Sequence, residues 1–194
     1  MKSIILIFLP VILLVSGLIF DISAMNGAGD AGPEAAIIVD SDSLFANIDV
    51  YNGKRVETCG TIIHVCGVDG KKMRLKTPGD ARIKVVPGEG MKAFDAVTYK
   101  NKYVKVRGIV KETRIDDKYI EGMEKERALL CHVDHTPCLS KGWRAEAEAA
   151  GTVDSISALG TSRLRERVKK TGKGYFSAVT IIADSCEVTG NAEE

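Results

Sequence analysis

The stretch KYVKVRGIV, from Lys102 to Val110, shows the clearest secondary-structure pattern in the chain. Its valines and Gly108 fall on one face, whereas Lys105 and Arg107 fall on the other. Strict alternation of apolar and polar residues is typical of a β-strand with one buried face, because successive side chains point to opposite sides. The stretch therefore predicts a strand that covers a core with its valine face.

Four other stretches have strand character: 54–66, 71–76, 82–86 and 176–188. The first of them alternates in the same way, and Gly60 lies in its middle, where a bulge or a sharp bend is expected. A short helix is expected within 90–99, before the strand that starts at Lys102. The last stretch lies far from the others along the chain and predicts a late fifth strand.

The chain between 115 and 172 has a different character. Charge is dense from Asp117 to Arg127, and the segment from Thr152 to Lys170 suits an amphipathic helix. The residues expected on its inward face are Ile156, Leu159, Leu164 and Val168. The pattern predicts helices inserted ahead of the last strand.

Four strands, a short helix and a late fifth strand are the elements of an OB-fold, a small five-stranded Greek-key barrel. We therefore predict a mainly β fold with a helical insertion: an OB-fold-like barrel with helices between strands 4 and 5. The alternative that the residues leave open is a four-stranded sheet followed by a separate helical unit.

The N-terminus starts with Lys2 and continues with an uncharged apolar segment from Ile4 to Phe20. A charged start followed by an apolar stretch is typical of a secretion signal, and the segment is also at the short end of what spans a bilayer. We expect residues 1–24 to be a signal peptide or a membrane anchor. A buried core helix is the alternative interpretation.

The predicted organisation follows from these segments. Residues 25–52 form a linker and a short helix, and residues 53–190 form the barrel domain, with the helical insertion at about 115–172. We expect an exported protein, periplasmic or membrane-anchored and facing outside the cytoplasm. The membrane is then a predicted partner through the N-terminal segment, if that segment is not cleaved.

Several short motifs resemble a family of exported bacterial proteins with an OB-fold, related in shape to the anticodon-binding type of OB domain. The matching motifs are TIIHVC at 61–66, GKKM at 70–73, VRGIVKE at 106–112, EGME at 121–124 and GKGY at 172–175. The family has no settled function. The resemblance therefore implies a fold and an exported address, and it implies no chemistry.

The histidines and cysteines are concentrated in two stretches. His64 and Cys66 are two residues apart in a predicted strand, so both side chains point to the same side. The second stretch, which lies much later in the chain, is the eight residues from Cys131 to Cys138, and it holds four more potential ligands. Thiolate and imidazole groups are typical ligands of zinc and copper, with zinc bonds of about 2.0–2.3 Å. The predicted metal ligands are His64, Cys66, Cys131, His132, His135 and Cys138.

Disulfides are the competing interpretation of the same residues. The chain has five cysteines, so pairing alone leaves one over. Cys131 can close a small loop with Cys138, and Cys59 can pair with Cys66 or with Cys186. A bulge at Gly60 would instead bring Cys59 to the side of His64 and Cys66. A reactive thiol is the third interpretation.

Basic residues gather on the predicted sheet: Lys71, Lys72, Arg74, Lys76, Arg82, Lys84, Lys105, Arg107 and Lys111. OB-folds bind single-stranded nucleic acid with such a face when aromatic side chains lie among the charges. Here only Tyr99 and Tyr103 are near, and the net charge of the whole chain is +1. A solvated strand face is therefore the favoured interpretation, and nucleic acid is an unlikely partner.

No catalytic motif is present. The sequence lacks G-x-S-x-G, H-E-x-x-H, a phosphate-binding glycine loop and a redox C-x-x-C. We expect an exported, non-catalytic OB-fold binding module that takes a metal ion, an exported partner or a small ligand, with zinc or copper as the only cofactor. Single-stranded nucleic acid or an oligosaccharide on the basic face is one alternative, and a thiol-redox protein is the other.

Overall fold

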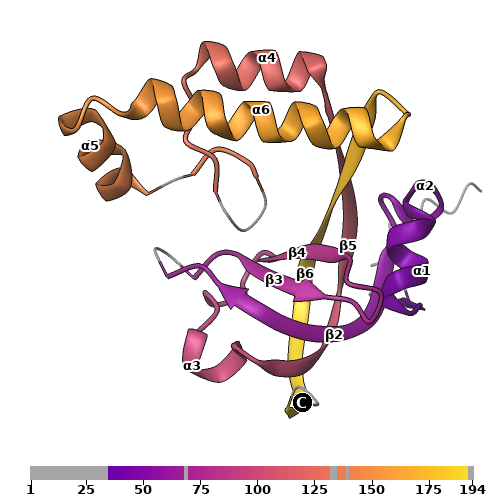
Figure 1. Ribbon diagram of the computed structural model, residues 1–194. Coiled ribbons are helices and arrows are strands. Elements are labelled where there is room, and N and C mark those ends of the chain that lie inside the picture. The colour runs from indigo at the N-terminus through magenta and orange to yellow at the C-terminus, as the bar shows by residue number, and fades with distance from the viewer. Residues whose placement is uncertain (1–34, 68–69, 132–134, 139, 192–194) are drawn as a thin grey trace, which may run out of the picture. The chain divides into compact units, whose positions relative to one another are not determined.

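The computed structural model of the chain describes residues 35–67, 70–131, 135–138 and 140–191 (Figure 1). All of these belong to one compact unit. The predicted signal peptide or membrane anchor lies outside the described residues and stays a prediction. In the described part of the chain, no helix is both long enough and apolar enough to cross a membrane.

Strands and helices follow each other along the chain as the sequence pattern suggests. The order is β1 (Ile37–Ile38), α1 (Ser41–Ala46), α2 (Ile48–Tyr51), β2 (Arg55–Val65), β3 (Met73–Lys76), β4 (Arg82–Pro87), α3 (Ala96–Tyr99), β5 (Lys102–Asp116), α4 (Asp117–Lys125), α5 (Lys141–Ala149), α6 (Val153–Thr171) and β6 (Tyr175–Asn191). The two-residue strand β1, which pairs in parallel with β2, was not predicted.

Five strands close into a barrel in the order β2-β3-β4-β6-β5, and β5 pairs back onto β2. β4 and β6 run parallel, whereas the other neighbours in the barrel run antiparallel. This is the arrangement of an OB-fold, so the predicted fold class is confirmed. The helices α4, α5 and α6 lie between the fourth and fifth barrel strands, as predicted. The alternative of a separate helical unit is wrong, because β6 joins the sheet.

The apolar side chains of the alternating strand pattern fill the interior of the barrel. Every barrel strand sends buried side chains inward, among them Val56, Ile62, Met73, Leu75, Ile83, Val85, Val104, Val106, Val179 and Ile181. Leu44 of α1 and Ile48 of α2 extend the same core. Asp40 caps α1 by accepting a hydrogen bond of 2.8 Å from the backbone N–H of Ser43. The segment before the barrel is therefore packed onto it.

Two glycines allow neighbouring strands to approach each other closely. A Cβ atom on Gly108 would lie 2.2 Å from the carbonyl oxygen of Ile182, and one on Gly60 would lie 2.4 Å from a methyl carbon of Leu75. The pairing of β5 with β6 shifts by one residue at Arg107 and Gly108, which marks a bulge. The extra residue of the bulge is Asp184 of β6, so Gly108 lies opposite the point where β6 bends.

The bulge in β2 lies further along the strand than Gly60, where it was predicted. The register with β3 shifts between Ile62 and His64, so Ile63 is the extra residue. The side-chain parity of the strand therefore changes at Ile63.

The helical insertion has its own core at the far ends of β5 and β6. Figure 1 shows α4 and α6 side by side, on the part of these two strands that extends beyond the barrel. The residues that pack between them are Ile115, Ile120, Met123, Ala128, Leu164, Val168 and Phe176. α5 packs on the first turn of α6 through Ala147 and Val153, together with Leu129.

The inward face of α6 differs from the predicted one. Leu164 and Val168 are buried as predicted, and Ile156 is partly buried, but Leu159 is 53% exposed. Ser157 and Thr161 take the buried positions, and the Thr161 hydroxyl donates to the carbonyl of Ser157 at 3.1 Å. Small residues on this face let α6 lie close to its neighbours, which rotates Leu159 away from the core.

We expect Gly108→Ala to lower the free energy of unfolding by at least about 2 kcal/mol, because the new methyl group meets backbone atoms of β6 that cannot move aside. Gly122→Ala is the matched control. Gly122 lies in α4 with open space around it, so alanine there should stabilise the helix by about 0.5–1 kcal/mol. Urea unfolding of the three proteins measures both effects, and an unchanged midpoint for Gly108→Ala would contradict the proposed role of Gly108.

Candidate functional site

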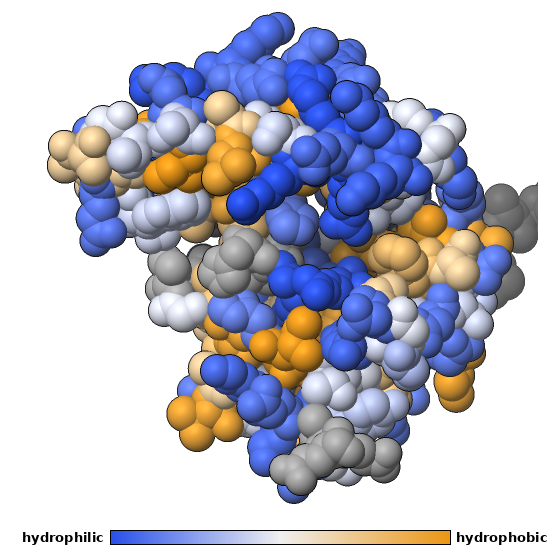
Figure 2. All heavy atoms as spheres, viewed as in Figure 1, coloured by the Kyte–Doolittle hydropathy of each residue, from blue (hydrophilic) through white to orange (hydrophobic). Residues whose placement is uncertain are grey.

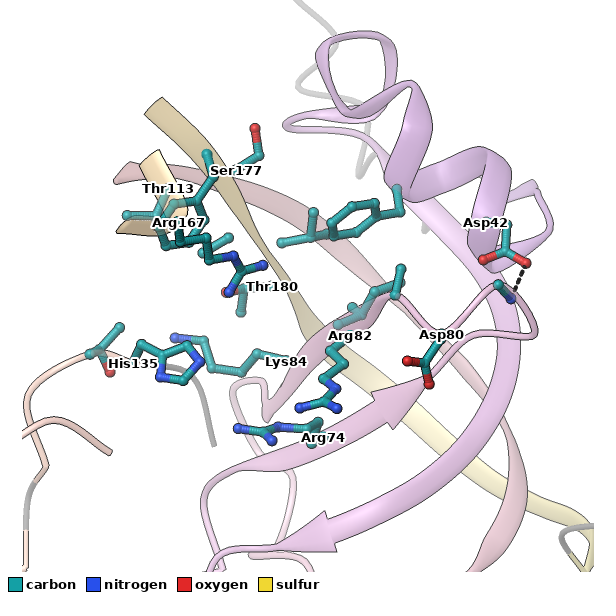
Figure 3. A pocket seen from close by; sticks show the side chains of 18 residues that line it. Asp42, Arg74, Asp80, Arg82, Lys84, Thr113, His135, Arg167, Ser177 and Thr180 are labelled. Atoms are coloured by element: carbon teal, nitrogen blue, oxygen red, sulfur yellow. Dashed lines mark hydrogen bonds between the residues drawn. The ribbon is translucent and has the colours of Figure 1, made fainter. Parts of the chain in front are cut away.

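A cleft of about 640 Å³ lies where the outer faces of β3 and β4 meet the base of β6 and the helix α6. Four cationic side chains line it, Arg74, Arg82, Lys84 and Arg167, together with His135, and Asp42 and Asp80 lie at one end. In Figure 3 the side chains of these residues reach into one space from different elements. Figure 2 shows the hydrophilic side chains gathered around this hollow.

The strand pattern explains why cations face the cleft. In β3, Met73 and Leu75 are buried, so the alternate residues Arg74 and Lys76 point outward. In β4, Ile83 and Val85 are buried, so Arg82 and Lys84 point outward in the same way. The register then places Arg74 opposite Lys84, and Lys76 opposite Arg82. Like charges directly opposite each other destabilise a sheet. This part of the barrel therefore carries a concentration of positive charge that its own pairing does not favour.

Arg167 brings a further charge from α6. Its guanidinium carbon lies 4.1 Å from the centre of the ring of Phe176, which is the second residue of β6. The pKa of Arg167 is lowered, first because burial of the charged group removes water from it and second because of the nearby charge of Arg82. The barrel and the insertion thus point positive charges at each other across the cleft.

The two acidic residues at the cleft are engaged in the turn between β3 and β4. Asp42 accepts from the hydroxyl of Thr77 and, at 2.8 Å, from the backbone N–H of Gly79. Asp80 forms an ion pair of 3.0 Å with Lys76, and this contact is the main reason why the pKa of Asp80 is lowered. Arg82 and Arg167 form no ion pair with any residue in the described segments.

A second hollow of about 410 Å³ continues from the first and shares Arg74, Arg82, His135 and Arg167 with it. Its other lining residues come from the insertion and are mostly apolar: Leu130, Cys131, Trp143, Ile156, Leu159, Gly160, Arg163 and Leu164. The two hollows together form a continuous groove, basic in its middle and apolar toward α5.

OB-folds bind oligonucleotides and oligosaccharides on their second and third strands, between the loop that joins strands 1 and 2 and the loop that joins strands 4 and 5. Here β3 and β4 are these strands, and the helical insertion replaces the second loop. The groove therefore occupies the ligand-binding face of the fold.

No family model matches this chain, and no match to it was found among curated proteins. Among solved structures, it is similar to a chain in the crystal structure of the S. pombe Stn1–Ten1 complex, at 13% identity and a TM-score of 0.28. The match covers 40% of this chain and 66% of the other, so the chain spans just under two thirds of that protein. A likeness of this size carries no argument about function, and the fold rests on the strand order.

The basic residues noted in the sequence divide into two groups. Lys105 and Arg107 of β5 lie outside the groove beside Glu57, and Arg107 approaches its carboxylate to 2.6 Å. Arg74, Arg82 and Lys84 line the groove. Sequence reasoning missed Arg163 and Arg167. Their spacing of four residues places them on one helix face, but only the tertiary structure shows that this face meets the barrel.

The bulge at Ile63 places Cys59 and His64 on the same outer side of β2, and Cys66 directly follows the strand. A bulge at Gly60 was expected to have this effect. Cys59 and Cys66 nevertheless lie seven residues apart along the strand, which corresponds to roughly 20 Å. A disulfide spans a much shorter distance between Cα atoms. At this separation, Cys59 and Cys66 can neither form a disulfide with each other nor bind the same metal ion.

The segments 129–131 and 135–138 pair with each other as the two arms of a small hairpin. The backbone N–H of Cys131 donates to Thr136 at 2.7 Å, and the N–H of Cys138 donates to Leu129 at 2.7 Å. Cys131 and Cys138 are therefore diagonal neighbours on one face, roughly 7–8 Å apart, which is longer than a disulfide normally spans. His132 lies outside the described residues.

The two histidine–cysteine stretches approach the same end of the barrel. His64 pairs across strands with Arg74, and Arg74 lines the groove together with His135. Lys72 also contacts Thr136 of the hairpin at 3.4 Å. Within the described segments, no three His, Cys, Asp or Glu side chains are placed to hold a metal ion. Because His132 is not among them, the predicted metal site stays a prediction.

Cys59 and Cys186 do not resemble reactive thiols. Burial raises the pKa of both, and it raises that of Cys186 to about 12. A nucleophilic cysteine needs a lowered pKa, so these two shifts go in the unfavourable direction. Cys186 packs against the barrel core, whereas Cys59 is on the outer side of β2, and both are free thiols in this structure.

Proposed function

We propose that this chain is an OB-fold binding module and that its ligand is an anion held in the basic groove. The observation that carries the proposal is the register of β3 and β4, which sets Arg74 opposite Lys84 and brings Arg82 into the lining of the same groove. Arg167 adds a charge from the opposite wall. An anion between these groups would turn repulsion between like charges into charge-assisted hydrogen bonds.

Nucleic acid is a less suitable ligand for this groove than a compact anion. Binding of single strands relies on exposed aromatic rings on which bases stack. Of the aromatic residues at the larger hollow, Phe176 is buried beneath Arg167 and Phe45 is packed against the barrel core. Tyr99 packs against that core, and Tyr103 lies on β5. The larger hollow, where most of the charge lies, therefore offers no stacking surface for bases.

We expect the double variant Arg82→Gln, Arg167→Gln to bind inorganic pyrophosphate at least about tenfold more weakly than the wild type at low salt, because two charge-assisted contacts are removed. Isothermal titration calorimetry measures the affinity. Arg107→Gln is the matched control, since Arg107 lies outside the groove beside Glu57, and it should leave the affinity unchanged.

Two outcomes would contradict the proposal. One is a wild-type protein that binds no pyrophosphate at low salt, and the other is an equal loss of affinity in the Arg107→Gln control. A wild type that retains a short oligothymidylate in a salt-dependent manner, but not pyrophosphate, would instead favour the nucleic-acid alternative.

Export is a separate proposal, motivated by the apolar segment from Ile4 to Phe20. We propose that the domain acts outside the cytoplasm, as a secreted or membrane-anchored protein. A fusion of residues 1–30 to a reporter that is active only after export should give activity. An inactive fusion, together with an intact Met1 on cytosolic protein, would contradict export.

Metal binding is a second candidate function, favoured by the hairpin that places Cys131 and Cys138 on one face. We expect reduced wild-type protein to bind about one equivalent of zinc, with an affinity that falls at lower pH because thiolates and neutral imidazoles take up protons. A His64→Ala, His135→Ala variant should bind clearly less. Elemental analysis and a zinc titration measure this, and reduced protein indifferent to zinc would exclude the site.

A further inference from the structure

The smaller hollow differs from the rest of the groove in having an apolar wall. This wall belongs to the insertion and is formed by Leu130, Trp143, Ile156, Leu159 and Leu164. Four arginines line the same hollow: Arg74, Arg82, Arg163 and Arg167. An apolar wall and a cluster of positive charge therefore meet within one space of about 410 Å³. Cavities of this size hold small organic ligands.

The apolar wall is partly exposed: Leu164 is buried, whereas the other members of the wall keep part of their surface accessible. Leu159 is 53% exposed, and Trp143 and Ile156 are only partly buried. Gly160 explains how the floor is built, because a Cβ atom there would come within 3.0 Å of Leu130. The hairpin thus packs directly on α6 at Gly160, while Leu159, the residue before Gly160, lines the hollow.

We propose that the groove binds an anionic amphiphile, with its charged head among Arg74, Arg82 and Arg167 and its apolar tail along Trp143, Ile156 and Leu159. This proposal rests on the anion-binding function proposed above and names the class of ligand. Charge complementarity fixes the head at the point where the two hollows meet, because the arginines there line both. The apolar wall adjoins these arginines and includes Trp143 of α5.

The chemistry of the two parts selects the ligand. Guanidinium groups bind phosphate and carboxylate heads through paired hydrogen bonds. The apolar wall favours an alkyl chain, because each methylene that leaves water adds to the affinity. A simple inorganic anion would leave the wall exposed, and a neutral lipid would form no ion pair with Arg82 or Arg167. Only a molecule with both parts satisfies the whole hollow.

The test uses the single tryptophan of the chain as a local reporter. Trp143 lines the hollow, so its emission should shift to shorter wavelength when an alkyl chain replaces water beside it. The full chain is titrated with methyl, butyl, hexyl and octyl phosphate, and with octanoate to compare head groups. We expect the affinity to rise about threefold per methylene, with a blue shift for the longer chains only.

Two variants separate the tail from the head. Leu159→Asn should reduce the gain per methylene while leaving methyl phosphate affinity unchanged, and Arg82→Gln should weaken every phosphate of the series by a similar factor. Val97→Asn is the matched control for Leu159→Asn, because Val97 is 88% exposed on α3, outside the groove. It should behave as the wild type in every titration.

The outcomes distinguish this proposal from the one on which it rests. If pyrophosphate and methyl phosphate bind but longer chains bring no gain, the amphiphile is excluded and anion binding stands. If the alkyl phosphates gain affinity equally in Leu159→Asn, the tail lies elsewhere and the proposed wall is wrong. If no phosphate binds at all, both proposals fail.

Discussion

The barrel depends on the close approach of three backbones at Gly108. This residue pairs with Val56 on β2 and with Ala183 on β6, so it belongs to two ladders at once. Any side chain there would collide with the backbone of β6. Because Gly108 has no side chain, β6 can approach β5 closely here, and the neighbouring residues Thr180 to Ala183 of β6 pair with β4. Closure therefore determines where the groove begins.

The geometry of the groove depends on the pairing of β5 with β6. Beyond the barrel, β5 and β6 stay paired as far as Asp116 and Tyr175. Ser177 donates to Glu112 at 2.6 Å across this ladder. Leu164 and Val168 pack α6 against α4, and the exposed ion pairs of Arg165 with α4 contribute little to stability. Arg167 is thus positioned by packing and by strand pairing, more than by its own polar contacts.

The sequence allowed the barrel to be predicted because strand alternation is a local property. The valines from 104 to 110 and the glycines at the bends indicated both the elements and their buried faces. The exposure of Leu159 was missed, since a helix period shows which residues share a face but not which neighbours that face will meet. The convergence of Arg82 and Arg167 was missed for the same reason, because they are far apart in the chain. The metal ligands were chosen on residue type, on the strand parity of His64 and Cys66 and on their concentration in two stretches, and none of these specifies the distance between the stretches.

The extended ladder sets the height of the groove. α4 starts at Asp117, directly after β5, and three residues separate the end of α6 from the start of β6. These short junctions leave no long loop that could act as a hinge between the barrel and the helices. Each residue pair of the ladder adds about 3.3 Å, so the number of pairs beyond the barrel measures how far the helices stand from β3 and β4. Relatives with a shorter or longer ladder would accommodate ligands of different thickness on an unchanged barrel.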